Sequence, residues 1–145
     1  MITVNIGPTE GGLPMTILQL LTPITDVSWL SVTDTVRDAF DHLETYELSA
    51  APLVDSTGRY AGTVTQADLR RHVAGAVDRA AALATPLSAI ERRARNPAVG
   101  VDRDPASLAA EAAAHGFVPV VDATGRLAGV IDRRRLLDLH LPSAA

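Results

Sequence analysis

One eleven-residue pattern occurs twice in this chain, and it constrains the fold more than any other feature. Residues 52–62 and 119–129 share Pro, Val, Asp, Thr, Gly, Arg, Ala and Gly in register, so 8 of 11 positions match at a constant offset of 67. Chance does not produce such a match, so the chain contains two copies of one supersecondary unit. The length of 145 residues suits two small halves that depend on each other for a core.

Each copy of the pattern predicts a β-hairpin. Leu53-Val54 and Val120-Val121 are short apolar runs of the kind that form buried strands. The sequences Asp-Ser-Thr-Gly and Asp-Ala-Thr-Gly that follow are typical of turns, because Asp bonds its own backbone two residues on and Gly accepts a positive φ. The chain then returns as a second strand, over residues 60–65 and 127–131.

Helices and one further strand are predicted around each hairpin. Apolar residues at i, i+3, i+4 and i+7 from Val36 predict an amphipathic helix, capped by Thr33 or Asp34. Asp104-Pro105 opens an Ala-rich helix before the second hairpin, since Pro is favourable at the first helical position. We expect helices after the hairpins and strands ahead of each copy, at residues 66–73, 133–139, 26–29 and 98–101. Each unit is then β-α-β-β-α.

The order of these elements divides the chain into five segments. We expect an irregular leader, a first repeat, a helical linker, a second repeat and a tail, at residues 1–15, 16–75, 76–93, 94–141 and 142–145. The first repeat opens with one or two helical turns. The region between the repeats is Ala-rich and predicts a helix at residues 74–84, followed by a short helix at residues 85–92.

Composition and charge exclude several classes of protein. The net charge of −4 and the pI near 5.4 argue against non-specific nucleic-acid binding, which needs a basic face. The absence of Cys excludes disulfides and thiolate metal sites. The N-terminus lacks the apolar run of a signal peptide, and no stretch reaches the roughly 20 apolar residues that cross a bilayer. We therefore expect a cytoplasmic protein without membrane contact.

No catalytic or metal-binding pattern is visible in the sequence. The four histidines, His42, His72, His115 and His140, lack metal-ligand spacing, and His42 and His72 are expected on exposed helix faces. There is no Gly-x-Ser-x-Gly elbow and no Walker-type loop. We expect no enzyme, no metal and no obligatory cofactor.

The order of elements and several motifs resemble the CBS (cystathionine-β-synthase-type) domain. The resemblance rests on the Pro-Leu-Val-Asp and Pro-Val-Val-Asp starts, on the Gly-Arg turns, and on Gly62-Thr63-Val64-Thr65-Gln66-Ala67-Asp68, which is similar to the family's nucleotide motif Gly-x-x-Thr/Ser-x-x-Asp. Residues 95–99 and 117–122 are also similar to stand-alone bacterial two-domain CBS proteins. The resemblance covers residues 16–141 and implies an α/β fold in which two repeats pack as a pseudo-twofold Bateman module.

The resemblance implies an adenine-nucleotide site in the first copy. Thr65 would contact phosphate at a helix N-terminus, which attracts anions, and Asp68 would accept hydrogen bonds from both ribose hydroxyls. Three residues before the first hairpin strand would line the adenine pocket, and Val27 would close its other side; the three are Leu48, Ser49 and Ala50. The structural alternative for Thr65 and Asp68 is a helix N-cap with an acidic first turn.

The second copy departs from this motif. Asp132 stands at the Thr position and Arg135 at the Asp position. A carboxylate repels phosphate and Arg cannot accept from a ribose hydroxyl, so we expect a degenerate second site. Arg133 and its two neighbours either reach phosphates of a ligand in the first site or form a solvated face that pairs with Asp132 and Asp138.

Two functions follow from these expectations. The first is a regulatory protein that binds AMP, ADP, ATP, cyclic di-AMP, NAD or S-adenosylmethionine and changes its conformation or its binding to an effector protein. The alternative is a ligand-independent dimerisation or scaffold module. In both cases the resemblance implies a homodimer that pairs through helices.

Overall fold

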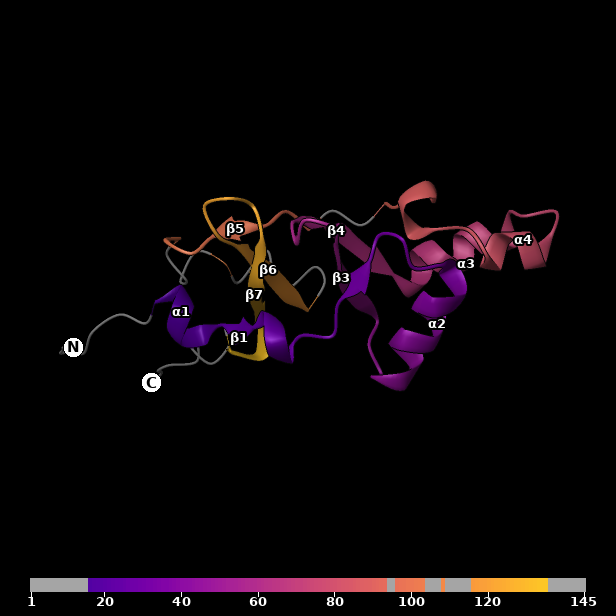
Figure 1. Cartoon of the computed structure of the whole chain (residues 1–145). Coiled ribbons are helices and arrows are strands. Elements are labelled where there is room, and N and C mark those ends of the chain that lie inside the picture. The colour runs from indigo at the N-terminus through magenta and orange to yellow at the C-terminus, as the bar shows by residue number, and fades with distance from the viewer. Residues whose placement is uncertain (1–15, 94–95, 104–107, 109–115, 136–145) are drawn as a thin grey trace.

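The chain folds into two small β-sheets, one for each copy of the repeat (Figure 1). The computed structural model describes residues 16–93, 96–103, 108 and 116–135. The strands of the first sheet are β2 (Leu30–Ser31), β3 (Ala50–Val54) and β4 (Tyr60–Thr65). The strands of the second sheet are β1 (Thr22–Pro23), β7 (Leu127–Asp132), β6 (Phe117–Val121) and β5 (Val99–Gly100), in that order across the sheet.

The two hairpins pair in the same register, which confirms the repeat. Pro52 faces Thr63 in the first copy, and Pro119 faces Val130 in the second. A β-bulge follows at the equivalent position in each hairpin. In both copies the short upstream strand runs parallel to the first hairpin strand. The predicted mixed α/β fold of two related units is therefore confirmed.

Short helices complete the described part of the chain. They are α1 (Ile17–Leu20), α2 (Val36–Thr45), α3 (Gln66–Ala74) and α4 (Arg79–Leu83), with 3-10 turns at Ile24–Asp26 and Leu87–Ala89. Helices α2, α3 and α4 gather at the end of the molecule away from the second sheet (Figure 1). Among the described residues, none of the helices has the length and apolar character needed to cross a membrane.

The start of the chain is built into the sheet of the second copy. Strand β1 pairs antiparallel with β7, so that Thr22 faces Val130 and Pro23 faces Gly129. Gly129 is required there, because a Cβ at this position would lie 2.1 Å from the carbonyl oxygen of Thr22. The sequence did not predict this strand. The five segment boundaries stay a prediction, and residues 22–23, which fall in the first repeat, contribute to the second sheet.

The two hairpin turns pair with each other where the copies meet. Arg59 and Arg126 face each other in an antiparallel bridge. The amide of Tyr60 donates to the carbonyl of Gly125 at 3.1 Å, and the amide of the residue after Arg126 donates to the carbonyl of Gly58 at 3.0 Å. Gly58 and Gly125 have φ values of +86° and +88°, which L-residues rarely adopt. These hydrogen bonds join the two copies.

One carboxylate oxygen holds each of these turns. Oδ1 of Asp55 accepts hydrogen bonds from the hydroxyl and the amide of Thr57, at 2.7 and 2.9 Å, and from the amide of Arg59 at 3.0 Å. Asp122 makes the same three bonds in the second copy, with Thr124 as its hydroxyl donor. The Thr hydroxyl is the main cause that lowers the pKa of each carboxyl below its ordinary value.

Each copy has its own apolar core, and a third cluster joins them. The first core lies between its sheet and helices and includes Leu43, Leu53 and Leu69. The second lies under α1 and includes Ile17, Val118 and Ile131. The joining cluster contains Ala50, Phe117 and Val130, with Val27 packed against it. This third cluster brings residues from both copies to one place.

Two predictions ahead of the first hairpin are wrong in detail. Residues 26–29 do not form a strand, because the 3-10 turn continues until the amide of Val27 bonds the carbonyl of Ile24 at 3.2 Å. The strand begins instead at Leu30, which is buried opposite Leu53. The cap of α2 is Thr35 and neither of the predicted residues, since the carboxylate of Asp34 accepts from the amide of residue 31.

The region between the repeats is less helical than predicted. Helix α3 is capped by Gly75, and the chain becomes helical again only at α4, where the side chain of Asp78 accepts from the amide of Ala81 at 3.2 Å. The helix predicted for residues 85–92 is limited to one 3-10 turn. The leader, the Ala-rich helix before the second hairpin, the end of the helix from residue 133 and the tail lie outside the described residues.

Candidate functional site

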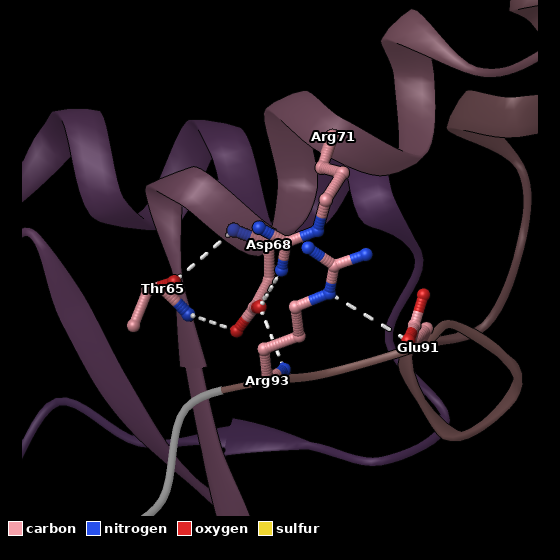
Figure 2. Close-up of polar contacts among 5 residues, drawn as sticks. All are labelled: Thr65, Asp68, Arg71, Glu91 and Arg93. Carbon is pink, nitrogen blue, oxygen red and sulfur yellow. Dashed lines mark hydrogen bonds and ion pairs between the residues drawn. The ribbon is translucent and has the colours of Figure 1, made fainter.

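The predicted motif of the first copy forms the start of α3. Thr65 is the N-cap: its hydroxyl accepts from the amide of Asp68 at 3.1 Å, and its own amide donates to the Asp68 carboxylate at 3.2 Å (Figure 2). This reciprocal pair is a capping box, which satisfies two amides that a helix end otherwise leaves unpaired. Thr65 and Asp68 therefore form the helix N-cap with an acidic first turn, the structural alternative to a nucleotide contact.

The Asp68 carboxylate is buried, at 1% exposure, and this chain's own groups surround it. Besides the amide of Thr65, it accepts from a guanidinium nitrogen of Arg71 at 2.5 Å and from the backbone amide of Arg93 at 2.9 Å (Figure 2). The Arg93 guanidinium turns away and pairs with Glu91 at 3.6 Å. Asp68 therefore ties the end of the linker to the start of α3.

A second polar cluster lies next to this motif. Asn96 is 8% exposed, and its amide group donates to the Thr63 hydroxyl at 3.3 Å and to the Phe117 carbonyl at 3.4 Å. The Tyr60 hydroxyl donates to the Asn96 carbonyl at 2.6 Å and lies 2.7 Å from the Thr63 hydroxyl. Burial raises the pKa of the Tyr60 phenol above its ordinary value. The cluster joins the first hairpin to the second.

A cavity of about 390 Å³ opens between the two copies, and we call it the cleft cavity. Residues of β1, of the turn after it, of the loop before β3 and of β3 itself line one part, and Gly116 and residues of β6 and β7 line the other. The lining residues are Thr22, Asp26, Val27, Ser28, Glu47, Leu48, Ser49, Ala50, Pro52, Gly116, Phe117, Val130 and Asp132. The volume falls within the roughly 300–1,000 Å³ of ligand pockets in general.

The sequence-predicted site residues divide into two groups. Val27, Leu48, Ser49 and Ala50 all line the cleft cavity, although about twenty residues separate the first from the others. The motif residues of α3 are not among the residues that line it. The structure thus brings the predicted base-binding residues together at one cavity. The predicted phosphate and ribose residues do not line this cavity, although Thr65 lies opposite Ala50 in the β3–β4 ladder.

The side chain and the backbone of one residue, Gln66, bind the loop before β3. The amide group of Gln66 donates to the Leu48 carbonyl at 3.0 Å, and the backbone amide of Gln66 donates to the Ser49 carbonyl at 3.0 Å. Glu47, just before them, has a φ of +55°, which is uncommon for a residue with a side chain. Two hydrogen bonds therefore attach the loop at the cavity wall to the start of α3.

Arg133 lies in a second hollow that adjoins the cleft cavity. Arg134 and Arg135 line it with Arg133, and Gly116 and Asp132 line both hollows. The amide of Arg133 donates to the Gly116 carbonyl at 2.9 Å, and a guanidinium nitrogen of Arg135 donates to the carbonyl of residue 20 at 3.2 Å. The three side chains are exposed and carry positive charge beside the cavity.

Sequence reasoning missed the acidic part of the cavity wall. Asp26, Glu47 and Asp132 line it, and each of them is exposed. Asp26 and Glu47 belong to no motif, so no sequence pattern predicts them. Asp132 was noticed only as a departure from the nucleotide motif. Phe117 could have been found, because it lies 67 positions after Ala50 and the repeat relates the two.

The histidines give no metal site in the part of the chain that the structure describes. No group of three or more His, Cys, Asp or Glu side chains lies close enough to hold an ion there. The expectation that His42 and His72 lie on exposed faces is wrong: both are half-buried, and Nε2 of each is buried without a hydrogen-bond partner. His42 packs its ring against Tyr46, with centroids 5.0 Å apart.

Comparison with known proteins identifies the family. The CBS domain matches residues 19–75 and 98–141, and the chain belongs to this family as a tandem pair. The CBS domains of a transcriptional regulator from Streptococcus pneumoniae are 25% identical, with a TM-score of 0.69 over 86% of this chain and 98% of that one. No curated protein matches the chain.

Two solved structures with the same fold contain nucleotides. CbpB, in complex with c-di-AMP, is 16% identical with a TM-score of 0.76, over 87% of this chain and 84% of that one. CBSX2, in complex with AMP, is 19% identical with a TM-score of 0.70, over 87% of this chain and 96% of that one. At these identities the likeness concerns the fold.

Proposed function

We propose that this chain is a regulatory protein that binds an adenine nucleotide in the cleft cavity between its two CBS copies. One observation carries the proposal: four residues expected to hold the base, Val27 and the run from Leu48 to Ala50, line one cavity beside the Arg133 side chain. CBS pairs with the same fold are bound to AMP and to c-di-AMP, which supports an adenine ligand.

The surroundings of the cavity suit the parts of a nucleotide. Val27, Leu48 and Ala50 offer apolar surface to a flat base. The guanidinium of Arg133 can pair with phosphate oxygens, and its planar fork can hold two oxygens at once. The roles predicted for Thr65 and Asp68 stay a prediction, and a substitution described below tests the role of Asp68.

Ligand binding would regulate by shifting a population of conformations. The cavity wall comes from both copies, so a ligand in it contacts both and stabilises the packing in which the wall is complete. An effector protein would read that packing, and a homodimer formed through helices would present it twice. We propose no catalytic step for this chain.

Thermal denaturation with and without AMP, ADP, ATP and cyclic di-AMP tests the proposal. A ligand at a hundred times its Kd adds about 2.7 kcal/mol to the free energy of unfolding. Ser49→Trp, which fills the exposed mouth of the cavity, should abolish the shift. Ser56→Trp is the matched control, because Ser56 lies exposed in a hairpin turn outside the cavity wall.

The alternative is a ligand-independent dimerisation or scaffold module. The hydrogen bonds that Asp68 makes within the chain favour it, since a nucleotide motif serves there as a helix cap. A wild-type protein that none of the four nucleotides stabilises, and that sediments as a dimer, would establish this alternative and refute the sensor. A shift that Ser49→Trp leaves intact would place the ligand outside the cleft cavity.

A further inference from the structure

The repeat relates the cleft cavity to an equivalent place between the two copies, beside the Thr65 motif. Ala50 and Val130, which line the cavity, correspond to Phe117 and Thr63 at the offset of 67. Strands β2 and β5 correspond at an offset of 69, because Leu30 pairs with Leu53 as Val99 pairs with Val120. The repeat therefore gives these cavity-lining positions a counterpart at the equivalent place.

Asn96 occupies the position that corresponds to Val27. Val27 is half-buried and lines the cleft cavity, whereas Asn96 is buried. The Asn96 amide donates to groups of Thr63 and Phe117, the two residues that correspond to cavity-lining ones. The Asn96 side chain thus lies between Thr63 and Phe117, whereas Val27 borders an open cavity at the equivalent place.

The segment just before Asn96 closes the same place from a second side. The Arg92 guanidinium donates to the Ala61 carbonyl at 3.1 Å, and the amide of Arg93 donates to the Asp68 carboxylate at 2.9 Å. A ribose would have to displace the amide of Arg93 and the guanidinium of Arg71 from this buried carboxylate, which would leave donors unpaired. The nucleotide motif of the first copy, which matches the family best, is therefore the one whose Asp68 already binds groups of this chain.

The charge of the cavity wall indicates how a ligand would lie. Asp26, Glu47 and Asp132 line the cavity, and their carboxylates would repel phosphate and would accept hydrogen bonds from ribose hydroxyls. The adjoining hollow carries the exposed guanidinium groups of Arg133 and its two neighbours. A nucleotide would keep its nucleoside in the cavity and extend its phosphates toward these groups.

We infer that each chain binds one mononucleotide, in the cleft cavity, and that Asn96 acts as an internal plug that closes the equivalent place between Thr63 and Phe117, beside the Thr65 motif. This inference rests on the proposed function. It assigns ribose recognition to the acidic wall and removes it from Asp68. Asp132 and Arg135, the two residues at which the second copy departs from the nucleotide motif, then lie at the nucleotide-binding site.

Titration calorimetry and NMR on the full chain, with AMP as the probe, test the inference. The expected stoichiometry is one AMP for each chain. The sequence contains two Asn, at positions 5 and 96, so selective ¹⁵N-Asn labelling resolves the plug directly. At saturating AMP, the Asn96 side-chain amide should stay protected from solvent exchange. In a uniformly ¹⁵N-labelled sample, the backbone amides of Leu48 to Ala50 should change their chemical shifts.

Two substitutions sharpen this test. Asp68→Asn should change the Kd for AMP by less than threefold, and Arg133→Ala should raise the Kd for ATP by about tenfold, the scale of one charge-assisted hydrogen bond. Circular dichroism confirms that each variant is folded before its titration. If Asp68→Asn is unfolded, the stoichiometry and the Asn96 signal still decide.

The outcomes separate this inference from the proposed function. Two AMP for each chain, loss of protection at Asn96, or loss of binding in folded Asp68→Asn would overturn the inference and leave a nucleotide-binding protein. A wild-type chain that binds none of the adenine nucleotides would overturn the proposed function itself. One AMP for each chain with a protected Asn96 would support the inference.

Discussion

Gly129→Ala tests the contact that joins the start of the chain to the second copy. A Cβ at position 129 would lie 2.1 Å from the Thr22 carbonyl oxygen, whereas real Cβ contacts are essentially never shorter than 3.0 Å. Strand β1 or β7 must therefore move by about 1 Å. Overpacking of this kind costs roughly 1–3 kcal/mol. The atom in the way belongs to the backbone, so a change of rotamer cannot relieve the contact.

Gly125→Ala is the matched control for this substitution. Gly125 has a φ of +88°, and a Cβ there would come no closer than 3.9 Å to another residue. Its cost is then only the left-handed backbone, roughly 1–2 kcal/mol. Gly129 also has a positive φ, of +158°, so an Ala there carries backbone strain in addition to the overpacking. We therefore expect Gly129→Ala to destabilise by at least about 1 kcal/mol more than this control, the lower end of the overpacking range.

Urea denaturation measures both variants. With m values of about 1–3 kcal/mol/M, a difference of 1 kcal/mol separates the two midpoints by roughly 0.3–1 M. Because Thr22 also lines the cleft cavity, Gly129→Ala should weaken nucleotide binding, while Gly125→Ala should leave it unchanged. Equal midpoints for the two variants would refute the pairing of β1 with β7.

Three further predictions concern stability. Asp68→Ala should lower the free energy of unfolding in urea by about 3 kcal/mol, because it leaves three donors without their acceptor, one of them a guanidinium. The control Asp38→Ala, which removes an exposed capping box of the same form, should cost about 1 kcal/mol. Equal losses would contradict the buried network. The lowered pKa values of Asp55 and Asp122 predict stability that is present above about pH 4 and lost as the pH falls through the lowered pKa values, so the double change to Asn should flatten the acid limb of a stability–pH curve. The raised pKa of Tyr60 predicts stability that is present below about pH 10 and lost as the pH rises through the raised pKa, and Tyr60→Phe should lack that loss in alkaline melts.

The repeat made most of the fold predictable, because its signals are local. Apolar runs, turn residues and a helical spacing lie within about twenty residues of one another, and each hairpin formed as expected. Strand β1 was not predictable in this way. It is two residues long, contains Pro23, and pairs with residues more than a hundred positions away, so neither length nor composition marks it as a strand.

The candidate site was predictable in part, for a physical reason. Val27 and Ala50 adjoin strands whose positions the repeat fixes, so their meeting at one cavity could be expected. The state of Asp68 could not, because its carboxylate accepts from an amide 25 residues further along the chain. A motif records which side chain is present at a position, but the partner of that side chain depends on how distant segments pack.

The position of β1 also bears on how the cleft cavity can transmit a signal. Thr22 lies in β1, and Asp26 and Val27 follow it, so the segment that pairs with β7 is also a wall of the cavity. A ligand that needs this wall binds only chains in which β1 is paired, and so it raises the population of that pairing. The size of the shift is limited by the difference in affinity between the paired and unpaired forms. Nucleotide binding and the β1–β7 contact should therefore stabilise each other, and Gly129→Ala should weaken both.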